Sequence, residues 1–470
     1  MKMLKYPLLI YLNIINIISV LSSKISQRGR YFLMNTAIIC LNLLGIIGHV
    51  NEDIKALLHY YDFLLPVASL SLILLLIAGI DKAINVKASL EYNPVFWAGW
   101  AICFIAMFIS SLIYPTKDIY FLWCILSLSI FPMIMMTWND QIKISKLFTL
   151  IAHHMVIASY LFVLINLLSV AFITNTYYTE GIGHEYLGIA PNPNSNGLIV
   201  LPFFTSALFL TITRRKNKAY YICSLFISIM FTLISNTRTA ELAMILEVMI
   251  ALLLVVRHKE AFLRTRITKK TISTIVVAII VSIAIGCCLM YLDRVDLKVY
   301  AEGEIEESYA DIYGHENLVR INQLSNGRLI LWKAYLKIVS FNGHGNPDGP
   351  LFEDYDYSRW AHNNALDIWY ASGFIAFAGY ITWLLAACGF VIISLVKRKG
   401  FRKEHLLTIL AFVGYFVEAM LEITIYPMQT GIVLLCFLTL MPIAFKGSDV
   451  VNSTEYPRKP TYLYGGRHYK

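Results

Sequence analysis

The sequence predicts an all-α polytopic membrane protein with about 12–13 transmembrane helices and one large outer loop that contains short amphipathic helices. Two observations predict this class. Hydrophobic residues make up 58% of the chain and charged residues only 15%, which lies outside the range of ordinary soluble domains. Apolar runs of roughly 18 residues or more also recur along nearly the whole chain, and each can cross a bilayer as a helix.

The predicted spans follow one another closely along the chain. They lie near 31–50, 63–80, 94–114, 119–137, 147–173, 197–213, 219–235, 240–256, 271–291, 364–396, 406–421 and 430–445, with a further candidate at 6–22. The last candidate is alternatively a cleaved signal peptide, but another span follows directly and Asn13 and Asn16 interrupt its core. We therefore favour an interfacial or imperfect first helix. The run 364–396 is long enough to include an interfacial turn.

The distribution of Lys and Arg predicts the orientation, because these residues mark short cytoplasmic loops. Most of them fall on one side when 214–218, 257–270, 397–404 and the C-terminal tail are placed inside. The predicted organisation is an N-terminal transmembrane bundle (1–291), a large extracytoplasmic loop (292–361), C-terminal transmembrane helices (362–445) and a cytoplasmic tail (446–470).

Several kinds of site are disfavoured. The eight cysteines lie within apolar runs and form neither a disulfide framework nor a ligand pattern. The chain has no GxxxxGK[ST] phosphate loop, which argues against an ATP-driven pump. Asp354 and Asp356 resemble the metal-binding DxD pair of soluble glycosyltransferases, but they are predicted outside, where nucleotide-sugars are not expected. His153 and His154 are adjacent on a helix and make a poor metal pair, so no metal site is predicted.

Two arginines are candidate anion-binding residues. Arg238 lies in a short turn between two spans at the predicted outer face, where it binds an anion, reaches lipid headgroups or pairs with Glu241. Arg328 begins a predicted amphipathic helix that Ser325 or Asn326 caps. The helix N-terminus and the guanidinium both favour an anion, although surface packing is the alternative. The apolar side of this helix is predicted to hold Leu329, Trp332, Tyr335, Leu336 and Val339.

A third group of polar residues surrounds the start of the run 364–396. The segment Phe341–Pro350 is too rich in Gly and Pro to continue a helix, and Gly343 and Gly345 permit close backbone approach to a ligand or simply a turn. His362 stands at the predicted outer face, directly before Asn363 and Asn364. An imidazole changes charge near neutral pH, so His362 is suited to general-base work; a structural or capping role is the alternative.

The order of four short motifs resembles the O-antigen ligase and Wzy-type polysaccharide polymerase superfamily. The motifs are Thr-Arg-Thr (237–239), Asn-Gly-Arg-Leu…Trp (326–332), Gly-His-Gly (343–345) and Ala-His-Asn…Leu…Gly (361–373). Each motif alone is weak, but their order, the many spans and the single large loop before a histidine-bearing helix make the match more specific. The resemblance covers roughly residues 190–440.

The resemblance implies a membrane-embedded, metal-independent glycosyltransferase without a cofactor, in the plasma (inner) membrane and with its active site facing outside or the periplasm. It implies an undecaprenyl-pyrophosphate-linked glycan donor, a glycan acceptor, membrane lipids and other polysaccharide assembly proteins as partners, and no nucleic acid. Arg238 and Arg328 would bind the donor pyrophosphate, and His362 would assist the acceptor hydroxyl. His344 replaces a residue that is commonly small or aliphatic and would share this work, while Asn363 and Asn364 would hold glycan hydroxyls or cap the helix.

Three functions remain open on these residues. The first is polymerisation of lipid-linked repeat units into a surface polysaccharide, and the second is ligation of the glycan to another acceptor. The third, from a different class, is a flippase or transporter for the same lipids. A transporter is expected to place charges near the bilayer midplane in a repeated arrangement. The chain shows no internal repeat and its candidate cations cluster at the predicted outer face, so we favour the transferases.

Overall fold

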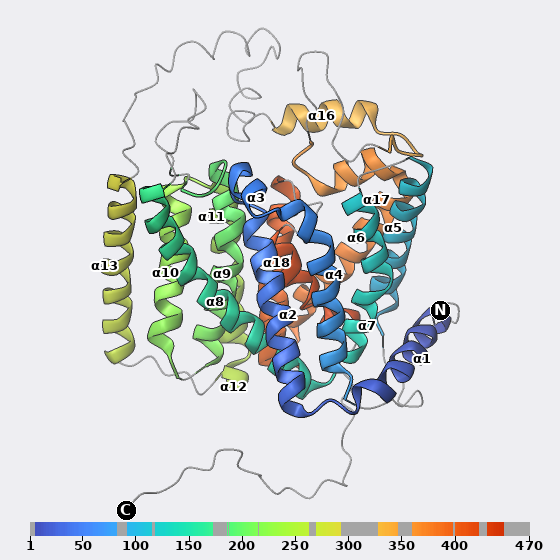
Figure 1. Ribbon diagram of the computed structural model, residues 1–470, viewed down its shortest axis with the longest axis horizontal. Helices are drawn as coiled ribbons and strands as arrows, with labels where there is room; N and C mark the ends of the chain where they lie inside the picture. Colours follow the sequence, from blue (N-terminus) through green and yellow to red (C-terminus); the bar gives the residue numbers. More distant parts are fainter. Residues whose placement is uncertain are drawn as a thin grey trace, which may run out of the picture.

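The described residues form a bundle of helices that run side by side (Figure 1). The computed structural model describes residues 5–81, 92–114, 118–172, 186, 188–214, 216–262, 269–292, 328–345, 360–397, 400–422 and 430–445. Its helices are α1 (Lys5–Ser22), α2 (Gln27–Ile47), α3 (Glu52–Leu57), α4 (Tyr60–Gly79), α5 (Pro94–Ile113), α6 (Asp118–Leu128), α7 (Ile130–Thr137), α8 (Gln141–Phe172), α9 (Pro193–Thr213), α10 (Lys218–Ile234), α11 (Arg238–Arg257), α12 (Lys259–Phe262), α13 (Lys269–Leu292), α16 (Arg328–Ile338), α17 (Asn364–Val396), α18 (Lys403–Leu421), α19 (Gly431–Phe437) and α20 (Met441–Ala444).

The chain is a multi-pass membrane protein. Within the described residues, nine helices are long and apolar enough to cross a membrane. Two further predicted spans correspond to the shorter apolar helix α10 and to α13, and 430–445 divides into α19 and α20. The first helix, α1, has 18 residues and lies obliquely at the edge of the bundle. These features confirm the predicted all-α polytopic membrane class, and the imperfect first helix stays a prediction.

Small residues allow the closest helix pairing, which joins α5 to α17. A Cβ atom on Gly99 would lie 2.4 Å from the backbone nitrogen of Trp383, and one on Gly379 would lie 2.3 Å from that of Cys103. Close backbone approach through small residues is typical of helix pairs in membranes. Aromatic side chains fill the space beside this contact, where Trp383 meets Trp100 and Phe437 with ring centroids 5.9 and 6.1 Å apart.

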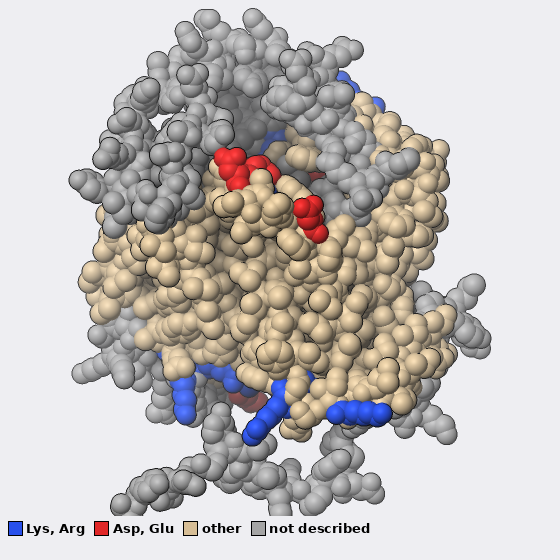
Figure 2. All heavy atoms as spheres, viewed as in Figure 1, with Lys and Arg blue, Asp and Glu red and all other residues tan. Residues whose placement is uncertain are grey.

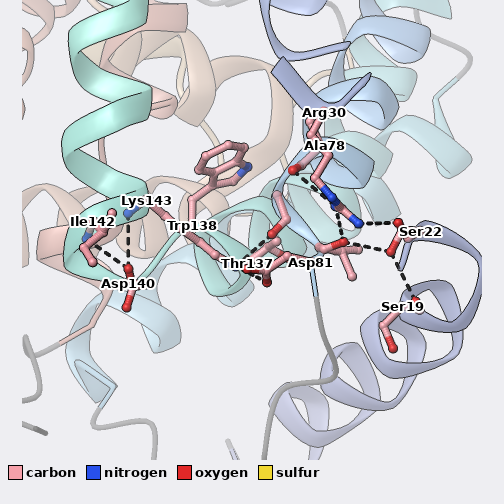
Figure 3. Close-up of polar contacts among 12 residues, drawn as sticks. Ser19, Ser22, Arg30, Ala78, Asp81, Thr137, Trp138, Asp140, Ile142 and Lys143 are labelled. Carbon is pink, nitrogen blue, oxygen red and sulfur yellow. Dashed lines mark hydrogen bonds and ion pairs between the residues drawn. The ribbon is translucent and has the colours of Figure 1, made fainter. Parts of the chain in front are cut away.

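The two ends of the bundle differ in charge. Lys and Arg residues gather at the end opposite α16 (Figure 2). We name this the basic end, defined by Arg30, Lys143, Lys146, Arg214 and Arg257, and the opposite end the α16 end. Two of these cations close the last turn of α4 (Figure 3): Arg30 donates to the carbonyl oxygens of Ile77 and Ile80, and Lys143 donates to Gly79 O at 2.9 Å and to Asp81 at 2.7 Å. Cations at a helix C-terminus satisfy its unpaired carbonyl groups.

A break in α17 provides the turn predicted within 364–396. Gly373 has φ 86° and ψ 177°, which separates a short first section from the long span. The segment Phe341–Gly345 fills the break: the backbone nitrogens of His344 and Gly345 donate to Tyr370 O and Ala371 O at 2.7 and 2.9 Å. Non-helical backbone at membrane depth requires such replacement partners. The first section of α17 is therefore held across the α16 end.

Candidate active site

Side chains from five segments of the chain meet at Glu422, at the α16 end. Glu422 directly follows α18 in an extended conformation, and its side chain is only 4% exposed. Its carboxylate forms an ion pair with Arg328 at 2.5 Å and accepts from the hydroxyl of Thr239 at 3.0 Å. The amide of Asn194 and Nδ1 of His362 each lie 3.4 Å from its second oxygen. The structure thus brings together two of the three predicted catalytic residues around a carboxylate that the sequence analysis did not single out.

Arg328 stands at the start of α16 and is 13% exposed. Its ion pair with Glu422 uses one terminal nitrogen, whereas a guanidinium carries five N–H donors in a planar fork. The attraction between the buried carboxylate and the guanidinium offsets much of the free-energy cost of removing both charges from water. The remaining donors of Arg328 are those able to bind a phosphate group at this end of the bundle.

Packing against the segment before α17 positions α16. Trp332 donates its indole N–H to Ala361 O at 2.8 Å, and Tyr335 is fully buried beside Ala361 and Tyr370. Burial, together with the neighbouring carboxyl of Asp367, raises the pKa of the Tyr335 phenol, so this hydroxyl remains a donor toward Asp367. These contacts fix where the first residue of α16 can lie.

The predicted apolar side of α16 is partly wrong. Leu329 and Leu336 are 37% and 57% exposed, whereas Leu331 and Ile338 pack with Trp332, Tyr335 and Val339. The reason is geometric: α16 contacts the chain along the row that runs through Tyr335, and Leu336 is about 100° further around the helix. The predicted capping residues Ser325 and Asn326 lie outside the described residues.

Asp367 holds the backbone on both sides of His362. Its carboxylate accepts from the backbone nitrogen of Ala361 at 2.8 Å and from that of Asn363 at 3.4 Å. His362 itself has φ 50°, a left-handed conformation that is uncommon for residues other than glycine. This local arrangement directs Nδ1 of His362 toward Glu422 while the side chain stays 34% exposed. Residues whose strained backbone is held in place by surrounding contacts, as His362 is by Asp367, often lie at functional sites.

The two asparagines after His362 have partners within the protein. Asn363 caps α17, because its side-chain oxygen accepts from the backbone nitrogens of Ala365 and Leu366 at 3.1 and 3.3 Å. Asn364 is buried and hydrogen-bonds the hydroxyl groups of Tyr380 and Tyr415. The structure therefore favours the capping alternative for Asn363 and a packing role for Asn364.

His344 lies apart from the Glu422 cluster. Its Nε2 is 2.7 Å from Ile338 O and its ring stacks on Tyr370, with centroids 4.5 Å apart. Gly343, with φ 78°, approaches protein backbone: a Cβ there would lie 2.5 Å from the nitrogen of Gly373. The Gly-His-Gly motif thus docks the end of α16 onto the break in α17.

Arg238 is the third predicted catalytic residue, and it is exposed at the first position of α11. The next residue, Thr239, donates to Glu422, so Arg238 lies beside the cluster along the chain. Among the described residues, no hydrogen bond or ion pair involves its guanidinium. The pairing with Glu241 that the sequence also allowed is not formed.

A second carboxyl group lies one turn below Glu422. Glu418 is 1% exposed, and neither of its carboxylate oxygens has a hydrogen-bond partner within the described residues. The signal for both residues was in the sequence, because two acids spaced by four residues end an otherwise apolar run. The sequence indicated a special role for Asp367 less clearly, because an acid in the first turn of a helix is common.

An apolar groove opens between α2, α3 and α8. Its volume is about 530 Å³, and its lining includes Leu43, Ile47, Leu161 and Ile165. The groove also includes Ile189, five residues before the Asn194 that contacts Glu422. The groove is thus connected to the Glu422 cluster along the chain, through the segment that joins Ile189 to Asn194.

Metal ligands do not gather in the described part of the chain. No group of three or more His, Cys, Asp or Glu residues that could hold a metal ion occurs there. Asp354 and Asp356 lie outside the described residues, as does the acidic run 302–307.

Comparison with models of known protein families tests the resemblance. Residues 223–381 match the family model described as O-Antigen ligase. The match extends from α10 into α17 and contains Arg238, Arg328 and His362. No curated protein and no solved structure matches the chain. The resemblance to O-antigen ligase and Wzy-type proteins is thus confirmed, and it implies glycan transfer at a membrane. Glu422 and Asn194 lie outside the matched segment.

Proposed function

We propose that the protein is a glycosyltransferase that moves a glycan from undecaprenyl pyrophosphate to an acceptor hydroxyl at the α16 end. The observation that carries this proposal is the meeting of Arg328 and His362 at Glu422. Within the class we favour polymerisation of lipid-linked repeat units into a surface polysaccharide, as the sequence analysis does. Ligation to a different acceptor is the alternative that uses the same donor.

Arg328 and Arg238 are proposed to bind the donor pyrophosphate. The leaving pyrophosphate gains negative charge as the glycosidic bond breaks, so fixed guanidinium groups stabilise the transition state more than the ground state. Arginine stays charged and binds phosphate oxygens with two N–H groups at once. The side chain of Arg238 is exposed and has no partner within the described residues, which suits this role, as do the remaining donors of Arg328. With this charge in place, we propose that transfer requires no metal.

His362 is proposed to be the general base. Its Nδ1 faces Glu422, which leaves Nε2 for the acceptor hydroxyl. Nε2 takes the hydroxyl proton while the acceptor oxygen bonds to the anomeric carbon of the donor glycan. The bond from that carbon to the pyrophosphate oxygen breaks, and undecaprenyl pyrophosphate leaves with the electron pair. Glu422 orients the imidazole and stabilises its positive charge, as a carboxylate does for histidine in hydrolase triads.

The apolar groove between α2, α3 and α8 is proposed to hold the polyprenyl chain of the donor. Its lining is almost entirely hydrocarbon, and one lining residue, Ile189, lies five residues before the Asn194 that contacts Glu422. A tail in this groove would keep the pyrophosphate near headgroup depth. His362 stands at the start of a membrane span, which is the depth at which the acceptor must meet that donor.

The α16 end is proposed to face the outside of the plasma (inner) membrane. The basic end would then be cytoplasmic, as the distribution of Lys and Arg favours. A transporter for the same lipids is the alternative from another class. It is disfavoured because Arg238, Arg328 and His362 all lie at one end of the bundle, away from the midplane.

The decisive experiment uses the purified full chain in detergent with a lipid-linked repeat unit and a chelator. Detergent removes the two compartments that a transporter requires. A transferase should still lengthen the glycan and release undecaprenyl pyrophosphate under these conditions. If the wild-type protein transfers nothing to repeat units or to several other plausible acceptors, the transporter is favoured. Activity that depends on an added divalent cation would remove the metal-independent part of the proposal.

A further inference from the structure

A cavity of about 720 Å³ opens at the basic end of the bundle, remote from the Glu422 cluster. Its walls come from the parts of α2, α8, α9 and α18 nearest that end. The lining residues are Tyr31, Ile142, Ser145, Lys146, Thr149, Leu150, His153, Arg214, Lys403 and Glu404. No step of the proposed transfer reaction uses this cavity.

The cations of the cavity differ from their neighbours at the same end. Arg30 and Lys143 donate hydrogen bonds to carbonyl oxygens at the end of α4 (Figure 3), and Arg257 donates to Val396 O. In contrast, the side chains of Arg214 and Lys146 contact no carbonyl or carboxylate oxygen within the described residues. Arg214 donates to the hydroxyl of Thr149, and Lys146 lies 5.4 Å above the ring centroid of Tyr31.

The charge balance of the cavity is positive. Its lining includes Lys146, Arg214 and Lys403 but one acid, Glu404, which is buried with Lys403 at 3.9 Å. Lys403 is also the first residue of α18, a helix of 19 residues whose N-terminus carries partial positive charge. An anion entering the cavity would therefore meet the guanidinium of Arg214 and the ammonium of Lys146.

The shape of the cavity favours a lipid over a small soluble anion. Along α8 the lining extends from Ile142 to His153, which is about 16 Å of helix and deeper than a headgroup layer. Ile142 and Leu150 provide apolar wall beside the cations. Basic pockets between membrane helices on the cytoplasmic side bind the head groups of anionic phospholipids.

We propose that this cavity binds the phosphodiester head group of an anionic phospholipid, with Arg214 and Lys146 as its ligands. The proposal is independent of the transferase assignment, because it rests on residues at the opposite end of the molecule. The ligand chemistry is a phosphate ester, and undecaprenyl phosphate and inorganic phosphate share it. We commit to the phospholipid, and the other two are separate arms of the test.

The test is native mass spectrometry of the full chain in mild detergent, titrated separately with phosphatidylglycerol, phosphatidylcholine, undecaprenyl phosphate and inorganic phosphate. We expect one phosphatidylglycerol to bind in preference to the other three. The double variant Lys146→Gln/Arg214→Gln should weaken this binding about thirtyfold, since each surface cation contributes roughly a factor of five. Arg28→Gln is the matched control, because Arg28 is exposed near the same end and does not line the cavity.

A second variant keeps the proposal testable if the double variant does not fold. Ser145→Phe retains all the cations but places an aromatic ring in the cavity, so it should also abolish tight phosphatidylglycerol binding. Equal binding by Ser145→Phe, by the double variant and by Arg28→Gln would overturn the proposal. Preference for phosphatidylcholine, for undecaprenyl phosphate or for inorganic phosphate would equally overturn the assignment to an anionic phospholipid.

Discussion

At the scale of single residues, Glu422 is the side chain on which the candidate site depends. It touches Arg328, His362, Thr239 and Asn194, so Glu422→Gln removes the charge that fixes both catalytic side chains. We expect kcat for glycan transfer to fall roughly a hundredfold or more, with a smaller change in KM. Partial recovery in Glu422→Asp would separate this positioning role from general damage. The measurement is steady-state transfer by purified protein.

Glu418→Gln, in the last turn of α18, is the matched control. Glu418 is buried and its carboxyl group forms no hydrogen bond within the described residues, so an amide of the same size breaks no contact there. This variant should keep its transfer rate and melt at the same temperature as the wild type or higher. Equal losses of activity in Glu418→Gln and Glu422→Gln would show that Glu422 has no special role.

The two arginines should respond differently to replacement by lysine. Lysine preserves charge but not bidentate geometry, so Arg238→Lys and Arg328→Lys should each lose most transfer activity. Arg328→Lys should also lower the melting temperature, because it loosens the ion pair with Glu422, whereas Arg238→Lys should not. Transfer assays and thermal unfolding in detergent measure the two effects. Normal activity in both variants would remove the pyrophosphate-binding role.

The sequence predicted part of this cluster for a physical reason. Arg328 and His362 follow local patterns, a helix start and a polar break before an apolar run. Their partner Glu422 lies 94 residues from Arg328 and 60 from His362, so only the folded chain brings the three together. The role of Asn363 was open in the sequence, because one amide suits both a helix cap and a glycan hydroxyl, and its contacts in the structure favour the cap.

At the scale of elements, the break in α17 is the feature that holds α16 in place. Gly373 has φ 86°, and a Cβ there would lie 2.4 Å from Phe341 O. Gly373→Ala should therefore destabilise the protein by about 1–3 kcal/mol, the usual cost of such a strained backbone position. The control is Gly389→Ala in the same helix, where nothing lies within 4 Å of an added Cβ. Thermal unfolding should separate the two variants, and equal melting temperatures would contradict this account of the break.

The element boundaries show what hydrophobic runs can and cannot predict. The runs located the spans well, because length and apolarity are what a bilayer requires. They could not predict that 119–137 divides at Ser129 or that 430–445 forms two short helices, since those breaks depend on packing. Likewise, Leu336 looked like part of the apolar face of α16, and only the position of Ala361 and Tyr370 shows which row is buried.

At the scale of the whole molecule, the orientation of the bundle is a prediction that labelling can test. Cysteine introduced at exposed Asn342, near the α16 end, should react with a membrane-impermeant thiol reagent in intact cells. Cysteine at exposed Glu260, beyond the last turn of α11, should react only after the membrane is opened. The parent protein is the control, because Cys287 is itself exposed. The reverse labelling pattern would invert the proposed topology.

The most direct test of the central claim is transfer by a variant that lacks only the imidazole of His362. His362→Gly accepts the left-handed backbone at this position, so the fold should survive. In detergent, with a lipid-linked repeat unit, we expect the rate of undecaprenyl pyrophosphate release to fall by roughly 10²–10⁴-fold. Free imidazole should restore part of this rate in His362→Gly, but not in the variant that also carries Glu422→Gln. Transfer by His362→Gly at the wild-type rate would contradict the account.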